Sequence, residues 1–305
     1  MKKIRKKRKA LIENILLLLS FILCISLCLI VFLNKTKSVV FADVYNDELD
    51  YERVSTLDLD LYSDKYMLIR LDDMKVLYGK NINEQFYPSS LAKVVTMDAL
   101  LHNVDNIEET SFYSNEQYNT LIADNASIAG LKTNTDYKLE ELLYALILPS
   151  GADAAVALEN YCRANNINLI DEMNKLKDEL LLENSNFTNT TGLHDDLLYT
   201  TMSDYAKIII DTIKFDIGKS VLKSLLYEGV DESYTSSLST LGNCVYAKVL
   251  GGKTGFTYEA GLNLCVLYRQ NNRSYLLLLA NATGEYREHN NIKDALKIFE
   301  YLYRG

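Results

Sequence analysis

The sequence is poor in the residues that build metal centres and disulfide frameworks, and it contains no tryptophan. Its three histidines, His102, His194 and His289, lie far apart, and no histidine or cysteine pair has the spacing of a zinc site. Two of the five cysteines, Cys24 and Cys28, fall in an apolar stretch, and the other three show no paired spacing. We therefore expect no disulfide framework, no metal and no cofactor.

Basic residues are scarce beyond the N-terminus. Nine of the 32 Lys and Arg residues lie within residues 1–42, together with only one of the 41 acidic residues. Residues 43–305 therefore hold 23 basic and 40 acidic side chains, a net charge of −17. A domain this acidic repels polyanions, so we expect no nucleic-acid partner.

A basic cluster followed by a long apolar run marks the N-terminus. Seven basic residues precede Ile15–Leu33, a stretch without any charge. As a helix it would span roughly 28 Å, close to the hydrocarbon thickness of a bilayer. Residues 1–34 are predicted to be a cytoplasmic tail and a transmembrane anchor with the rest of the chain outside. A signal peptide cleaved after Val40–Ala42 is the alternative, which would give a secreted protein.

The remaining pattern predicts a linker over 35–60 and one folded domain over 61–305. A hairpin signal opens the domain, with Asp72-Asp73 between two short apolar runs, 66–71 and 75–78. A strongly apolar helix follows over 90–103, with Ser89 as its expected N-cap. Further periodicity predicts helices over 139–148, 152–162, 169–182, 201–215 and 292–303, and strands over 246–251, 261–269 and 275–280.

This order of elements predicts an α/β fold of the α+β type. Strands near both ends of the domain can join one mostly antiparallel sheet flanked by helices. The helices between them would form a lobe inserted between the N-terminal and C-terminal strands. A pocket between the sheet and this lobe would be the usual place for a ligand.

Ser90 and Lys93 form the first candidate catalytic element. A serine hydroxyl needs a base, and a lysine one helical turn later lies on the same helix face. Burial can lower the pKa of such a lysine until its amine accepts a proton near neutral pH. The Ser-x-x-Lys spacing recurs at Ser220–Lys223, where we interpret it as a solvated helix face. Ser90 is distinguished by its context, Tyr-Pro-Ser-Ser before a buried helix.

Two further elements could complete a site around Ser90. Gly252-Lys253-Thr254-Gly255 comes at the end of a predicted strand, where an ammonium and a hydroxyl suit a substrate carboxylate. Its glycines permit close approach of a peptide backbone. Ser150, directly after Pro149, could pass a proton between Lys93 and a leaving amine, although it could also cap the following helix.

In order and spacing, these elements resemble the serine D-alanyl-D-alanine carboxypeptidases, the low-molecular-weight penicillin-binding proteins. The resemblance covers roughly residues 60–305 and includes the segments Leu142–Ala157, Asn189–Asp195 and Gly251–Leu264. It implies a β-lactamase/transpeptidase-like fold and removal of the terminal D-alanine from peptidoglycan stem peptides ending in D-Ala-D-Ala. It also implies inhibition by β-lactams.

The resemblance also implies roles for individual residues. Ser90 would attack the carbonyl between the two D-alanines, Lys93 would be the general base, and Ser150 would relay the proton to the leaving D-alanine. The backbone N–H groups of Ser90 and Phe256 would form the oxyanion hole. His194 matches the family, but we interpret it as structural. The implied substrate-binding residues follow one another along the chain: Lys253, Thr254, Gly255 and Phe256.

One departure from the family pattern keeps other functions open. Where the family usually has Ser-x-Asn, this chain has Ser150 followed by Gly151 and Ala152. Loss of that asparagine could lower the rate by about 10–1000-fold. A catalytically weak protein that binds penicillin or peptidoglycan is therefore one alternative. A β-lactamase is the other, although the chain lacks the Glu-x-x-Leu-Asn and Ser-Asp-Asn segments of class A enzymes.

Overall fold

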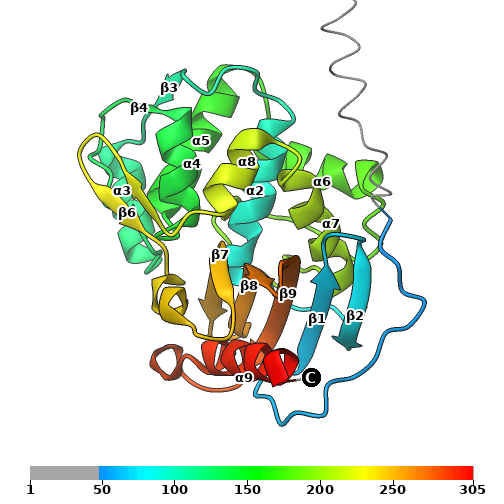
Figure 1. Cartoon of the computed structure of the whole chain (residues 1–305). Coiled ribbons are helices and arrows are strands. Elements are labelled where there is room, and N and C mark those ends of the chain that lie inside the picture. The colour runs from blue at the N-terminus through cyan, green and yellow to red at the C-terminus, as the bar shows by residue number, and fades with distance from the viewer. Residues whose placement is uncertain (1–47, 305) are drawn as a thin grey trace, which may run out of the picture. The chain divides into compact units, whose positions relative to one another are not determined.

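An antiparallel sheet of five strands lies at the centre of the part of the chain that the computed structural model describes, residues 48–304. Its strand order is β2-β1-β9-β8-β7, so strands from the two ends of the domain share one sheet, as the sequence predicts (Figure 1). The predicted hairpin over 66–78 is confirmed by the first two strands. The strands are β1 (Lys65–Arg70), β2 (Lys75–Lys80), β7 (Lys248–Thr257), β8 (Gly261–Gln270) and β9 (Arg273–Ala282).

Both faces of the sheet are buried, and the side-chain alternation along each strand divides between two hydrophobic clusters. In β1, Tyr66 and Leu68 belong to the cluster under α9 (Asn290–Arg304). Met67 and Ile69, which point the other way, belong to the larger cluster under the remaining helices. Because both faces of the strand are covered, its residues 66–69 form a continuous apolar run.

The helical lobe lies on the face of the sheet away from α9 (Figure 1). At its centre a short 3₁₀ turn, η1 (Ser89–Leu91), runs directly into α2 (Ala92–Leu101), which is buried along its whole length. The predicted helices over 139–148, 152–162, 169–182, 201–215 and 292–303 are confirmed within a few residues. The remaining lobe helices are α3 (Asn115–Ala123), α4 (Leu139–Ile147), α5 (Ala152–Ala164), α6 (Leu169–Glu179), α7 (Met202–Thr212) and α8 (Asp216–Leu222).

The structure adds or corrects several local features. Helix α3, the hairpin of β5 (Leu226–Glu228) and β6 (Ser233–Thr235), and the short pair β3 (Thr110–Ser111) and β4 (Tyr137–Lys138) were not predicted, whereas Ser220, interpreted as part of a solvated helix face, lies on α8. The strand predicted over 246–251 continues to Thr257, so the Lys-Thr-Gly motif lies inside β7 and not after it. The glycines interrupt the apolar pattern of the sequence. A β-bulge between Val249 and Gly251 shifts the register there, and β8 continues to pair with β7 beyond it.

The prediction that Ser89 caps the helix over 90–103 is wrong. Neither η1 nor α2 has a side-chain cap at its N-terminus. The hydroxyl of Ser89 donates to the carbonyl of Pro88 and accepts a hydrogen bond from the side-chain amide of Asn263 on β8. Because a strand distant in sequence holds this hydroxyl, Ser89 joins the turn to the sheet and does not cap the helix.

The predicted tail and anchor, residues 1–34, lie outside the described residues. Among the described residues, no helix combines the length and the apolar character needed to cross a bilayer. The predicted linker over 35–60 is described from residue 48, and there it runs beside β2, with Asp50 bridged to Lys75. Leu49 and Leu57 are buried. These two side chains attach an otherwise polar stretch to the domain.

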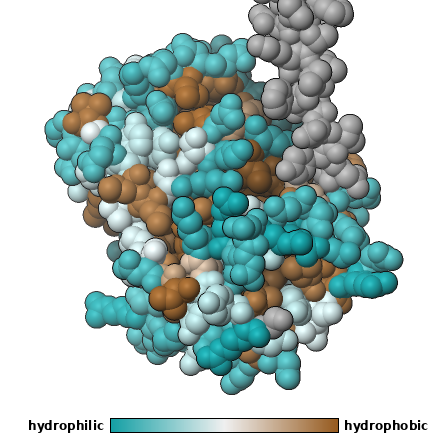
Figure 2. All heavy atoms as spheres, in the orientation of Figure 1, coloured by the Kyte–Doolittle hydropathy of each residue, from teal (hydrophilic) through white to brown (hydrophobic). Residues whose placement is uncertain are grey.

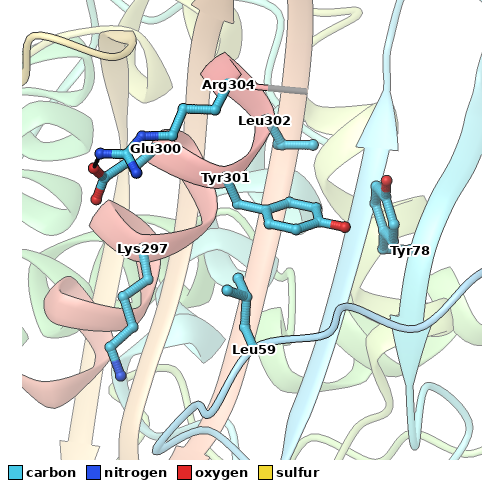
Figure 3. Close-up of a pocket in the computed structure, with 7 residues that line it drawn as sticks. All are labelled: Leu59, Tyr78, Lys297, Glu300, Tyr301, Leu302 and Arg304. Atoms are coloured by element: carbon cyan, nitrogen blue, oxygen red, sulfur yellow. Dashed lines mark hydrogen bonds and ion pairs between the residues drawn. The ribbon is translucent and has the colours of Figure 1, made fainter.

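A hollow of about 610 Å³ lies on the α9 side of the sheet. It forms between α9, β2 and the segment around Leu59, and the rings of Tyr78 and Tyr301 approach each other edge-on across it (Figure 3). Hydrophilic residues cover most of the face seen in Figure 2, and hydrophobic residues appear there as separate patches. A separate cleft, on the helical side of the sheet, is lined by Ser90 and Lys93, the first two predicted catalytic residues.

Candidate active site

The turn from η1 into α2 brings Ser90 and Lys93 together. Lys93 Nζ donates to Ser90 Oγ at 3.2 Å, as expected for side chains three residues apart on one helix face. Lys93 is 2% exposed, whereas Ser90 is partly open to solvent. A buried amine therefore contacts a hydroxyl that a substrate can reach.

Burial sets the protonation of Lys93. Removal from water lowers the pKa of its amine to about 7, against the opposing charge of Asp153. The amine also donates to the backbone carbonyl of Thr191, which fixes its direction. Near neutral pH a large fraction of Lys93 is uncharged, which is the state that accepts a proton.

Strand β7 forms the opposite wall with its outer edge. Lys253 is fully buried there, and its Nζ donates to the carbonyl of Thr254 at 2.8 Å. Burial, and then the charge of Lys93, lower the pKa of Lys253 well below its usual value. The hydroxyl of Thr254 lies 2.7 Å from that of Ser237. Two buried lysines thus lie close enough for the charge of Lys93 to act on Lys253.

Two glycines allow the walls to approach the Ser89–Ser90 turn. A methyl group on Gly255 would lie 2.3 Å from the hydroxyl of Ser89 and 2.9 Å from the carbonyl of Pro88. One on Gly192 would lie 2.1 Å from the carbonyl of Ser89, and Gly192 also has a φ of +75°. Any larger residue at either position would push the turn away from its neighbours.

Gly192→Ala is therefore expected to lower the free energy of unfolding by about 2–5 kcal/mol, from backbone strain and overpacking combined. Gly130→Ala is the matched control, because Gly130 has a φ of +92° but open space around its Cβ position. It should lose only about 1–2 kcal/mol. Denaturant unfolding of both variants measures the difference, and equal losses would show that the close approach to Ser89 has no effect.

A cleft of about 610 Å³ opens beside Ser90. It lies between the α2 turn, the end of β7 and two loops of the helical lobe. Its walls are both polar and aromatic, with a carboxylate at Asp124 and at Glu259. The residues that line it are Ser90, Lys93, Asp124, Asn125, Ala126, Ser127, Ala152, Thr191, Gly192, Leu193, His194, Phe256, Thr257, Tyr258 and Glu259.

Lys253, Thr254 and Gly255 are not among the residues that line the cleft, and neither is Ser150. Within residues 48–304 its hydroxyl is buried without a hydrogen-bond partner, on a backbone with φ of +68°. The structure thus brings Ser90 and Lys93 together, lines the cleft with Phe256, and leaves the relay role of Ser150 a prediction.

Several residues that hold the site were not predicted as site residues. The carboxylate of Asp153 accepts from the backbone N–H groups of residues 129, 130 and 131, which holds the loop after α3 against the cleft. Asn263 is fully buried, and its amide reaches the carbonyls of Tyr87 and Pro88. A capping box at Ser114 and Gln117 could have revealed α3 and hence this loop.

His194 also lines the cleft, where its ring meets that of Tyr87 edge-on at 4.9 Å between centroids. Its nitrogens lie near carboxylates, 3.3 Å from Asp196 and 3.9 Å from Glu259. These contacts connect the loop after residue 191 to the residues just beyond β7. The structural role expected for this histidine stays a prediction.

Comparison with known proteins shows which proteins this chain is similar to. A model of the D-alanyl-D-alanine carboxypeptidase family matches residues 52–283. The D-alanyl-D-alanine carboxypeptidase DacF of Bacillus subtilis is 28% identical over 225 residues, which are 71% of this chain and 57% of that protein. DacA of Haemophilus influenzae is 26% identical over 238 residues, 73% and 57% of the two chains. The matches therefore span little more than half the length of these two relatives.

Solved structures share the fold. The DD-transpeptidase of a Streptomyces strain superposes with a TM-score of 0.71 at 22% identity, over 82% of this chain and 98% of that one. A D-alanyl-D-alanine carboxypeptidase from Mycobacterium tuberculosis gives 0.67 at 18% identity, over 84% and 96%. The predicted β-lactamase/transpeptidase-like fold, with its antiparallel sheet and helical lobe, is confirmed.

Proposed function

Because the chain belongs to the D-alanyl-D-alanine carboxypeptidase family, we propose that it removes the terminal D-alanine from peptidoglycan stem peptides through an acyl-enzyme on Ser90. The observation that carries the proposal is the contact between Ser90 Oγ and the buried amine of Lys93, at 3.2 Å and open to the cleft. We also propose that the catalytic domain works outside the cytoplasmic membrane, as the N-terminal pattern predicts.

In the proposed acylation, neutral Lys93 takes the proton of the Ser90 hydroxyl as Oγ attacks the carbonyl between the two D-alanines. The backbone N–H groups of Ser90 and Phe256 would stabilise the oxyanion. The C–N bond then breaks, and the departing amine receives a proton relayed through Ser150. Water would hydrolyse the ester and restore the free serine hydroxyl.

The proposed binding of the substrate uses the edge of β7. Because β7 is the edge strand of the sheet, an extended peptide could pair with it, as at other sheet edges. The ammonium of Lys253 and the hydroxyl of Thr254 would hold the terminal carboxylate, which would also draw a proton onto Lys253. A β-lactam would enter the same cleft and acylate Ser90.

A non-turnover binder is the second candidate, and a specific observation favours it. Ala152 lines the cleft at the position where the family usually has asparagine, so its methyl group offers no hydrogen bond to a substrate. Asn125 and Ser127, on the loop after α3, line the same cleft and could take over that contact. A protein without such a replacement would acylate slowly or retain its ligand.

Release of D-alanine from a pentapeptide ending in D-Ala-D-Ala tests the proposal. The full chain in detergent should release many equivalents of D-alanine, and the same peptide ending in D-Ala-L-Ala should release no alanine. One equivalent or none, with penicillin labelling intact, would identify a binder instead. Rapid hydrolysis of nitrocefin without D-alanine release would identify a β-lactamase.

A further inference from the structure

Three side chains of types that can bind metal ions meet at the other end of α2 from Ser90. Asp98 lies on α2, and His102, four residues later, is the C-cap of that helix with helical backbone angles, so the two share one helix face. Asp211, on α7, faces them, and its Oδ2 lies 2.6 Å from His102 Nε2. One ligand atom from each residue can be chosen so that all three lie within 4.8 Å of one another. Both helices lie on the same side of the sheet (Figure 1).

Asp98 is the unusual member of this cluster. It is fully buried, and among the described residues neither of its carboxylate oxygens has a hydrogen-bond partner. The hydroxyl of the neighbouring Thr212 donates to the carbonyl of Ile208 instead. Burial, and then the charge of Asp211, raise the pKa of Asp98 well above its usual value. A carboxylate in this place is costly unless a positive charge lies beside it.

We propose that Asp98, His102 and Asp211 bind one divalent transition-metal ion, with zinc as the best fit. An imidazole and two carboxylates form a mixed nitrogen and oxygen set, which suits zinc better than magnesium. Bond lengths near 2.0 Å require ligand atoms roughly 3.3 Å apart in a tetrahedron, so small side-chain rotations would close the site. The ion would give the carboxylate of Asp98 the partner that it lacks.

The site is accessible from solvent on one side. The side chain of His102 is 32% exposed, whereas that of Asp211 is 9% exposed. An ion can therefore enter past the imidazole, and a water molecule can occupy the remaining position. Lys214 lies 3.1 Å from the other oxygen of Asp211, Oδ1, and leaves Oδ2 on the side of the histidine.

A bound ion would connect α2 to α7 at a second point. Near the N-terminal end of α2, the hydroxyl of Tyr205 on α7 already donates to the carbonyl of Leu91. The ion would join the same two helices near the C-terminal end of α2. The helix that positions the nucleophile would then be held at both ends, so we infer that the ion has a structural role.

Zinc titration of the chelator-treated full chain, followed by calorimetry, tests this site. The unmodified chain should bind zinc with a rise in melting temperature that magnesium does not reproduce. Asp98→Asn and His102→Gln should each lose one bound equivalent. His289→Asn is the matched control, because it removes a histidine outside the cluster, and it should bind as the unmodified chain does. Cobalt should give visible absorption bands that are lost in Asp98→Asn and in His102→Gln and kept in His289→Asn.

Two outcomes would overturn the proposal. Zinc uptake by both cluster variants equal to that of the His289→Asn control would place any bound zinc elsewhere. Absence of uptake by the unmodified chain, with Asp98→Asn raising the melting temperature without metal, would instead mean that the two carboxylates share a proton. Neither readout uses acylation of Ser90, so the result is independent of the proposed enzymatic function.

Discussion

Replacing Ser90 with alanine is expected to abolish covalent labelling of the full chain by a fluorescent penicillin. No other described hydroxyl is both open to the cleft and in hydrogen-bond contact with the buried amine of Lys93. Loss of a nucleophile that acts as a unit with its base costs on the order of 10⁶-fold in rate. Gel fluorescence after incubation to saturation should therefore show no band, while the melting temperature stays close to that of the unmodified chain.

The second Ser-x-x-Lys copy supplies the control. The hydroxyl of Ser220 donates to the carbonyl of Asp216 within its own helix, on the exposed surface of α8. It is not among the residues that line the cleft. Ser220→Ala should therefore label as the unmodified chain does. A labelled Ser90→Ala protein would contradict the assignment of the nucleophile.

Lys93→Met is expected to slow acylation by about 10²–10⁴-fold and to remove its dependence on pH near 7. In the unmodified chain, burial lowers the pKa of Lys93 to about 7, so the reactive amine is mostly protonated below that pH and mostly neutral above it. The acylation rate should thus rise as the pH passes upward through 7 and then level off. Stopped-flow measurement of penicillin acylation across this range gives both quantities.

Two companion variants separate the charge from the shape of this side chain. Lys93→Arg keeps a positive charge but cannot accept a proton, so it should be as slow as Lys93→Met. Lys175→Met removes an exposed lysine paired with Glu172 and should change neither the rate nor the profile. An unchanged rise near pH 7 in Lys93→Met would assign the titrating group to another residue.

The same lowered pKa has a consequence for stability. An unfolded lysine keeps a pKa near 10.5, so between about pH 7 and that value the unfolded chain binds more protons than the folded one at this position. The contribution of Lys93 to stability therefore becomes more favourable as pH rises through this range. Lys93→Met should flatten that part of the stability profile.

Sequence reasoning located the parts of the site that depend on local spacing. Ser90 and Lys93 meet because they are three residues apart, and the motif around Lys253 could be predicted from its glycines and its strand. The carbonyl of Thr191 and the side chain of Asn263 could not be assigned roles, because their partners at Lys93 and Ser89 lie far away along the chain. Tertiary contacts of this kind leave no periodic signal.

Tertiary contacts also explain why the N-cap at Ser89 was predicted incorrectly and why the cluster of Asp98, His102 and Asp211 was not predicted. Ser89 has the residue type and the position of an N-cap, but a buried amide from β8 competes for its hydroxyl. Asp98 and His102 share a helix face that could be predicted from their spacing. Asp211, the third member, follows His102 by 109 residues. Only the packing of α7 against α2 brings it there.

The strand order has a consequence for how the chain reaches its working form. Lys65 in β1 pairs with Ala280 in β9, so the central seam of the sheet joins residues from nearly opposite ends of the domain. Such a high contact order slows folding, because a long loop must close before the stabilising contacts between its ends can form. The nucleophile helix is synthesised early, but the strand that faces it comes late. A chain interrupted before β9 would therefore hold Ser90 in an unfinished domain without the complete cleft.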